Sequence, residues 1–195
     1  MVWAKNGTPV TLGSAAGVMT ISDMTANVFN MIMYHTILAS GNASDGLTFD
    51  NNTNTDYSRR MEIGNTDYTE INGANIDVDG ASLADNFGII YAANVSGEEK
   101  LIINPSTYQN IAGAGTAPGL VRSVGKCDTT TNSGQFTRID ITNVHGTPTD
   151  YNADSNLSAL GTEGVESLNV QDGAVYYETD TNKSYVLYNN AWTEL

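Results

Sequence analysis

Turn-forming segments return at short intervals along this sequence, and this spacing limits the fold more than any other feature. Glycine, asparagine, aspartate and serine gather at 41–46, 50–56 and 96–99, with short apolar runs between these clusters. Short strands separated by turns about every 8–12 residues are typical of β-sandwiches and barrels. We therefore expect an all-β chain, an antiparallel β-sandwich of jelly-roll type followed by a small C-terminal β-meander.

The composition favours strands over helices. Charged residues make up only 15% of the chain, and asparagine, threonine, serine and glycine replace helix-favouring lysine, arginine and glutamate. A helical bundle is therefore not expected. Because 40% of the residues are hydrophobic, the chain can still build a packed core, so we expect a folded protein rather than a disordered one.

The longest apolar stretch, residues 28–38, leaves two structures open. Its length permits a helix of about three turns. A strand pattern divides its side chains between two faces, Phe29, Met31, Met33, His35 and Ile37 on one and Val28, Ile32, Tyr34 and Leu38 on the other. A strand covered on both faces has this pattern, and we favour it over the helix.

The chain divides into three parts by composition. A β-sandwich domain is predicted at 1–156, with its clearest hairpin formed by 87–95 and 100–104. Small residues at 157–168 predict a linker. A strand–turn–strand–turn–strand pattern at 169–195 predicts the meander. Fewer than about 30 residues bury too little surface to fold alone, so we expect this module to assemble on the main domain, on its own copies or on a partner.

Charge and cysteine content exclude several classes of protein. The chain carries 22 acidic and 8 basic residues, and its net charge of −14 opposes nucleic-acid binding. No apolar run approaches the roughly 20 residues of a membrane span, so we expect no membrane insertion. A single cysteine, Cys127, excludes a disulfide scaffold. The first residues lack the apolar stretch of a signal peptide, so we expect the chain to be made and folded in the cytoplasm of the cell that produces it.

Catalytic motifs are absent from the sequence. It contains no Gly-x-Ser-x-Gly nucleophile elbow, P-loop or dinucleotide fingerprint. The two histidines, His35 and His145, are far apart, and His35 lies in an apolar run, where a packed residue is more common than a ligand. Cys127 has no partner motif and is expected to be an inert, partly buried thiol. Although two of the carboxylates could form a glycosidase pair, we predict no enzyme activity, no catalytic residues and no cofactor-binding residues.

Acidic loops provide the weak candidates for a metal site. Asp45, Asp50 and Asp56 flank an asparagine-rich run, while Asp77 and Asp79 precede a glycine. Calcium takes six to eight oxygen ligands from carboxylates, amides and carbonyls, which such loops can supply. Neither loop matches an EF-hand, so solvated turns rich in asparagine and aspartate are the favoured alternative to bound Ca²⁺.

Aromatic and basic residues suggest two kinds of surface contact. A sugar-binding platform is one interpretation of five tyrosines, although half-buried strand positions are the commoner one: Tyr57, Tyr68, Tyr91, Tyr108 and Tyr151. Arg59 and Arg60 are adjacent in an acidic chain. We expect them to pair with carboxylates inside the domain or across a subunit interface.

Several segments resemble a known group of proteins. Over most of its length the chain is similar to small tailed-virus (phage-type) virion proteins found in marine viral sequences. The similar segments are 3–9, 59–60, 96–101, 112–118, 154–161 and 172–188. The last of them, DGAVYYETDTNKSYVLY, looks like a module at the ends of many phage fibre and appendage proteins. The resemblance implies a β-sandwich virion component, either a head fibre or capsid decoration protein or a tail fibre.

The resemblance and the aromatic residues together define the expected function. We expect a non-enzymatic virion structural protein that acts by forming homo-oligomers, a trimer fitting a fibre best, and by contacting other virion proteins. Aromatic side chains are enriched in interface cores, which makes five residues interface candidates: Trp3, Tyr176, Tyr185, Tyr188 and Trp192. The alternative is a carbohydrate-binding or host-adhesion module, Ca²⁺-assisted or not, whose partner would be a host surface glycan.

Overall fold

The computed structural model describes most of the chain. Described are residues 3–38, 44–78, 85–109, 113–128, 133–144, 150–162, 173–188 and 191–195. They contain strands and turns but no helix, so none of them forms a helix long and apolar enough to span a membrane. The chain divides into two compact units, one reaching from residue 3 to residue 163 and the other holding the C-terminal residues from 164 onward.

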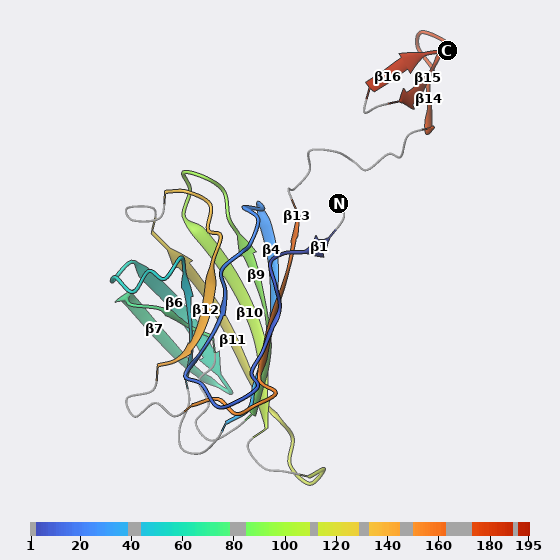
Figure 1. Ribbon diagram of the computed structural model, residues 1–195. Coiled ribbons are helices and arrows are strands. Elements are labelled where there is room, and N and C mark those ends of the chain that lie inside the picture. The colour runs from blue at the N-terminus through green and yellow to red at the C-terminus, as the bar shows by residue number, and fades with distance from the viewer. Residues whose placement is uncertain are drawn as a thin grey trace. The chain divides into compact units, whose positions relative to one another are not determined.

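A nine-stranded antiparallel sheet forms the larger layer of the first unit (Figure 1). Its order is β1-β13-β4-β9-β10-β11-β6-β7, and β2 also pairs with β13. The bounds are β1 Ala4–Lys5, β2 Val10–Thr11, β4 Phe29–Thr36, β6 Tyr57–Ile63, β7 Thr66–Gly73, β9 Asp85–Ala93, β10 Lys100–Gln109, β11 Gly119–Cys127 and β13 Asn156–Thr162.

A four-stranded antiparallel sheet forms the second layer, in the order β3-β12-β5-β8. Its strands are β3 Val18–Ile21, β5 Asp45–Phe49, β8 Ile76–Asp77 and β12 Ile139–Asn143. One hydrophobic core contains buried side chains of both sheets, among them Ile32 and Ile90 from the large sheet and Leu47, Phe49 and Ile141 from the small one. The two sheets therefore form a sandwich, and the expectation of an all-β fold is confirmed.

Strand β4 settles the ambiguity of residues 28–38 in favour of the strand. Its burial alternates, with Ile32 and Tyr34 completely buried and the intervening methionines half-buried. Tyr34 pairs with Gly88 of β9, where a Cβ atom would lie 2.3 Å from the tyrosine ring. The inward face of β4 therefore packs tightly, while its outward face is partly covered.

The predicted linker at 157–168 is wrong over its first six residues, because they belong to β13. Leu157 and Ala159 point into the core, and the strand pairs with β4 along its whole length. Small residues in this segment suit a tightly paired strand as well as a linker, so composition did not separate the two. The first compact unit accordingly extends beyond residue 156, while residues 163–168 lie outside the described part.

The C-terminal unit contains the three-stranded meander expected from the sequence. Strands β14 (Val175–Glu178), β15 (Lys183–Tyr188) and β16 (Ala191–Glu194) pair antiparallel in chain order. Among its described residues, Leu187 is the only buried hydrophobic side chain. The unit thus keeps its aromatic side chains at the surface.

Candidate functional site

Strand β10 of the β10–β11 hairpin turns mostly polar side chains toward the core. On β10, the buried positions include Lys100, Asn104 and Ser106, whereas Leu101 and Ile103 point outward and are exposed. Strand β11 is mixed: it buries Ser123 together with the apolar Val121 and Cys127, and it exposes Leu120 and Val124 together with Arg122 and Lys126. An amphipathic strand of a soluble protein normally has the opposite of the β10 arrangement.

Backbone carbonyl groups accept hydrogen bonds from the buried polar side chains of β10. Asn104 Nδ2 and Ser106 Oγ donate to the carbonyl oxygen of Val78, at 2.6 Å and 3.1 Å. Lys100 Nζ donates to the carbonyl oxygens of Val95 at 2.6 Å and Glu98 at 2.9 Å, and burial lowers the pKa of this ammonium group. The buried polar side chains of β10 are therefore satisfied internally, whereas Ser123 Oγ of β11 is buried without a hydrogen-bond partner among the described residues.

Six exposed apolar residues on neighbouring strands form what we call the outer apolar patch. Its members are Phe87 and Tyr91 of β9, Leu101 and Ile103 of β10, and Leu120 and Val124 of β11, each between 45% and 60% exposed. Strand register aligns one row of side chains across five strands: Met31, Tyr91, Ile103, Val124 and Arg60. Neighbouring exposed apolar residues mark an interaction surface more often than scattered ones do, although Arg122 and Lys126 lie among those of this patch.

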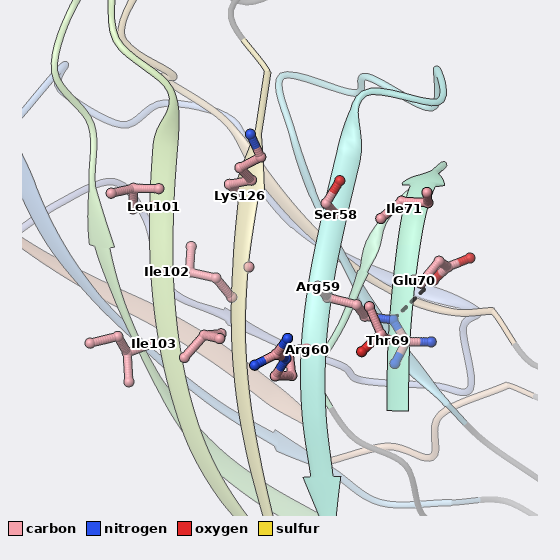
Figure 2. Close-up of a pocket in the computed structure, with 12 residues that line it drawn as sticks. Ser58, Arg59, Arg60, Thr69, Glu70, Ile71, Leu101, Ile102, Ile103 and Lys126 are labelled. Atoms are coloured by element: carbon pink, nitrogen blue, oxygen red, sulfur yellow. Dashed lines mark hydrogen bonds and ion pairs between the residues drawn. The ribbon is translucent and has the colours of Figure 1, made fainter. Parts of the chain in front are cut away.

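A shallow groove of about 500 Å³ runs along one side of the patch (Figure 2). Its lining combines Leu101, Ile103 and Val124 with Arg60 of β6 and Ile71 of β7. Ile71 is 70% exposed, so the apolar surface continues onto the edge strand. The groove holds no convergent set of catalytic groups and offers mainly apolar contact.

Charged side chains lie within and beside the patch: Arg122 falls between Val124 and Leu120 on β11, and Lys126 lies opposite Leu101. Arg122 Nη1 lies 3.7 Å from Glu62 Oε2, and Lys126 Nζ lies 2.6 Å from Glu99 Oε1, a contact that raises the pKa of the lysine. Arg60 lies in the same row as Val124. It makes no hydrogen bond or ion pair within the described residues. Protein interfaces combine apolar and charged residues, among which arginine is enriched, and this mixed surface has that composition.

The expected pairing of the two adjacent arginines holds for Arg59, which turns inward. Arg59 Nε donates to Glu70 Oε2 at 2.9 Å, and its guanidinium group also pairs with Asp77 on β8 (Figure 2 shows the Glu70 pair). Burial raises the pKa of Asp77 to about 6, and the Arg59 charge partly opposes this effect. This ion-paired group ties the edge of the small sheet to β6.

The aspartates proposed as Ca²⁺ ligands are engaged by protein groups and do not form one cluster. Asp45 is buried and accepts hydrogen bonds from Thr36 Oγ1, Asn86 Nδ2 and Tyr151 OH. The Asp50 carboxylate accepts two backbone N–H groups, and Asp56 accepts Asn52 Nδ2. Asp77 binds Arg59, and Asp79 lies outside the described residues. In the part of the chain that the structure describes, no three metal-ligating side chains converge.

The remaining single-residue expectations have different outcomes. Cys127 is completely buried, so the thiol is less accessible than expected. His35 is half-buried beside Phe87 on the outward side of β4, and His145 lies outside the described residues.

The five tyrosines do not form one platform. Tyr57 and Tyr151 are completely buried, and burial raises the pKa of Tyr57 above its ordinary value. Tyr68 and Tyr91 are exposed, and Tyr108 is half-buried. A sugar-binding platform of all five residues is therefore wrong, because two of them are core residues.

The interface candidates of the C-terminal unit divide between two faces of the meander. Tyr176, Tyr185 and Trp192 share one face with Glu178 and line a cleft of about 380 Å³. Tyr188 projects from the opposite face, according to the strand register. Trp3 precedes β1 in the other unit and is 37% exposed.

Comparison with known proteins adds no assignment. Neither the protein-family models nor the curated proteins nor the solved structures include a match to this chain. The functional argument therefore depends on the geometry just described and on the resemblance found in the sequence.

Proposed function

We propose that this protein is a non-enzymatic structural protein that assembles with copies of itself through the outer apolar patch. The observation that carries the proposal is the exposed apolar outward face of the β10–β11 hairpin and of β9. Water contact with this face is unfavourable, and association removes it. The resemblance to phage-type proteins supports a role in a virion, as a capsid decoration, head fibre or tail-fibre component.

The dimensions of the patch suit an interface core. The row of side chains from β4 to β6 extends over four steps of about 4.8 Å, and about six residues along β10 span roughly 20 Å. The patch itself occupies only the three strands β9 to β11, about 14 Å across, so its area is about 300 Å², at the lower end of the range of functional apolar patches on soluble proteins. A standard interface buries about 800 Å² on each partner, so the flanking polar strands would supply the rim.

A second copy fits this surface because both charge signs occur on it. Arg60 has no partner among the residues that the structure describes, and Glu62 lies two residues away on the same outward face of β6. In a twofold contact, each surface meets its own copy, so Arg60 of one chain can approach a carboxylate of the other. The trimer expected for a fibre stays a prediction, which the mass of the assembly distinguishes from a dimer.

The strand order supports a jelly-roll core with an inserted hairpin. Without β10 and β11, the central part of the large sheet has the order β4-β9-β6-β7, opposite β3-β12-β5-β8. These eight strands can be connected as the two Greek keys of a jelly roll, an architecture found in capsid and lectin domains. On this proposal the insertion widens one sheet and supplies four residues of the outer apolar patch. The fold analogy alone does not define a function.

The test compares the mass of the full chain with that of two lysine variants by sedimentation velocity. Ile103→Lys places a charge in the patch at a 60% exposed position, so folding is retained while association is lost. Thr142→Lys is the matched control, because Thr142 points outward from the small sheet. An oligomer of the wild-type chain and the control, but not of Ile103→Lys, supports the proposal. A monomeric wild-type chain, or an Ile103→Lys oligomer, overturns it.

A further inference from the structure

The cleft on the C-terminal meander is lined by three aromatic rings and one carboxylate. Tyr176 and Glu178 come from β14, Tyr185 from β15 and Trp192 from β16. The Tyr176 and Tyr185 ring centroids are 6.1 Å apart, with the planes inclined by 30°. Trp192 stands edge-on to Tyr176, at 6.0 Å and 63°. The rings therefore form two walls that meet at Tyr176.

Two of these rings remain exposed although aromatic side chains are scarce in the chain. Tyr176 is 51% and Trp192 is 46% exposed, whereas the aliphatic Leu187 on the same face is buried. Rings that only stabilised the meander would be expected to cover one another more fully. Their exposure leaves aromatic surface available to a ligand.

The charge of the cleft is negative. Glu178 Oε2 accepts hydrogen bonds from Thr181 Oγ1 and Tyr185 OH, but it forms no ion pair within the described residues. The nearby Lys183 pairs instead with Glu194, at 2.9 Å. The negative charge of Glu178 also helps burial to raise the pKa of Tyr185. Lys183 lies directly across from Glu178, so the carboxylates of Glu178 and Glu194 share this one cation and the charge beside the rings stays negative.

We propose that this cleft binds an organic cation of the quaternary-ammonium type. The negative faces of tyrosine and tryptophan rings attract a cation, and the methyl groups of a quaternary ammonium match their apolar surface. Glu178 adds the opposite charge at the cleft wall. A neutral sugar would need several hydrogen-bonding groups around its ring, and the lining offers mostly aromatic carbon.

The test uses the full chain and the indole N–H signal of Trp192 in two-dimensional NMR, which is readily assigned because the chain has only two tryptophans. Choline and its neutral isostere 3,3-dimethylbutan-1-ol are the matched probes. Choline is expected to bind about tenfold more tightly than the isostere, since the two differ mainly in charge. Phosphocholine and trimethyllysine, compared in the same titration, distinguish a lipid or glycan headgroup from a methylated protein.

Three variants assign the binding to the cleft. Glu178→Gln keeps the shape and is expected to weaken choline about fivefold without changing the isostere. Trp192→Ala is expected to abolish the choline signal in ligand-observed NMR. Tyr188→Ala removes an aromatic ring from the opposite face of the meander and leaves choline binding unchanged.

Four outcomes overturn the proposal. They are no choline binding, equal binding of choline and its isostere, tighter binding of a methyl glycoside than of choline, and unchanged choline binding by Glu178→Gln. If Trp192→Ala disturbs the meander, Glu178→Gln still decides. Because the cleft and the outer apolar patch lie in different units, the cleft can fail its test while the assembly proposal holds, and the reverse.

Discussion

The outward faces of the two sheets differ in chemistry although both sheets are antiparallel and cover the same core. The small sheet presents polar groups that bind one another: Asp140 is only 3% exposed and accepts hydrogen bonds from Thr20 Oγ1 and Arg138. The large sheet presents Leu101, Ile103 and Val124 to solvent. The core cannot account for this difference, since inward packing does not determine what points outward. On our proposal, a second copy covers the large sheet and solvent contacts the small one.

Two adjacent isoleucines of β10 test the contrast between an inward and an outward face, and they should give the largest difference in stability. Ile102 is 2% exposed in the core, and Ile103 is 60% exposed in the patch. Ile102→Ala is expected to lower the free energy of unfolding by about 2–4 kcal/mol, because it leaves a cavity. Ile103→Ala is expected to change it by less than about 1 kcal/mol in the monomer. Urea unfolding at low protein concentration measures both values.

Self-association should be affected more by Ile103→Ala than by Ile102→Ala, the opposite of the order expected for stability. Ile103→Ala removes apolar contact from the proposed interface, so it is expected to weaken association even though the chain stays stable. If Ile103→Ala destabilises the dilute monomer as strongly as Ile102→Ala, the outward face belongs to the packing of the domain itself. The contrast between the two faces of β10 would then be wrong.

The two sheets meet at an edge where a carboxylate should make stability depend on pH. Burial raises the pKa of Asp77 to about 6 in the folded protein, against 3.8 for the ordinary group. The folded state therefore retains a proton that the unfolded state releases, and stability falls as pH rises from about 4 to about 6. The full difference corresponds to about 3 kcal/mol as an upper bound, and it persists above that window.

The variant Asp77→Asn separates this carboxylate from the other acidic residues. We expect urea unfolding to show a smaller gain in stability for the variant than for the wild-type chain when pH is lowered from about 7 to about 5. Arg59 keeps its bond to Glu70 in the variant, so the edge contact is retained in part. An identical pH profile for the two chains would show that Asp77 titrates normally.

The sequence predicted the positions of the strands better than which face of each strand points into the core. Alternating apolar residues at 28–38 and 87–95 gave two central strands, since a period of two is visible without tertiary information. In β10, however, Leu101 and Ile103 alternate with Ile102 and Asn104, so the pattern does not say which set points inward. The buried Lys100 was equally hidden, because its partners are backbone carbonyl groups, which leave no mark in the sequence.

The buried carboxylate of Asp140 in the small sheet also leaves no mark in the sequence. It accepts a hydrogen bond from Thr20 and forms an ion pair with Arg138. Asp140→Ala leaves these donors without their acceptor and is expected to cost about 1–3 kcal/mol of unfolding free energy. Sedimentation velocity should show unchanged assembly, because this face contacts solvent. Loss of the oligomer in Asp140→Ala would mean that the polar face is also an interface.

The smallest expected effect concerns Arg60, the cation within the apolar row. Arg60 has no partner among the described residues, whereas Arg122, nearby on the same outward face, already lies close to Glu62. Arg60→Gln is expected to weaken association about fivefold, or about 1 kcal/mol, because it removes attraction to a carboxylate of another copy. The gap between wild-type and variant affinities should narrow as salt increases, since salt screens this attraction.

Arg122→Gln serves as the control for Arg60→Gln, with the same change of charge at a residue that has an internal partner. General repulsion between chains of net charge −14 affects both variants alike, so only a specific contact makes Arg60→Gln the weaker of the two. Equal affinities at every salt concentration would mean that Arg60 is merely solvated. The assembly would then depend on the apolar residues alone, and the contrast between the two outward faces would be one of hydrophobic area rather than of charge.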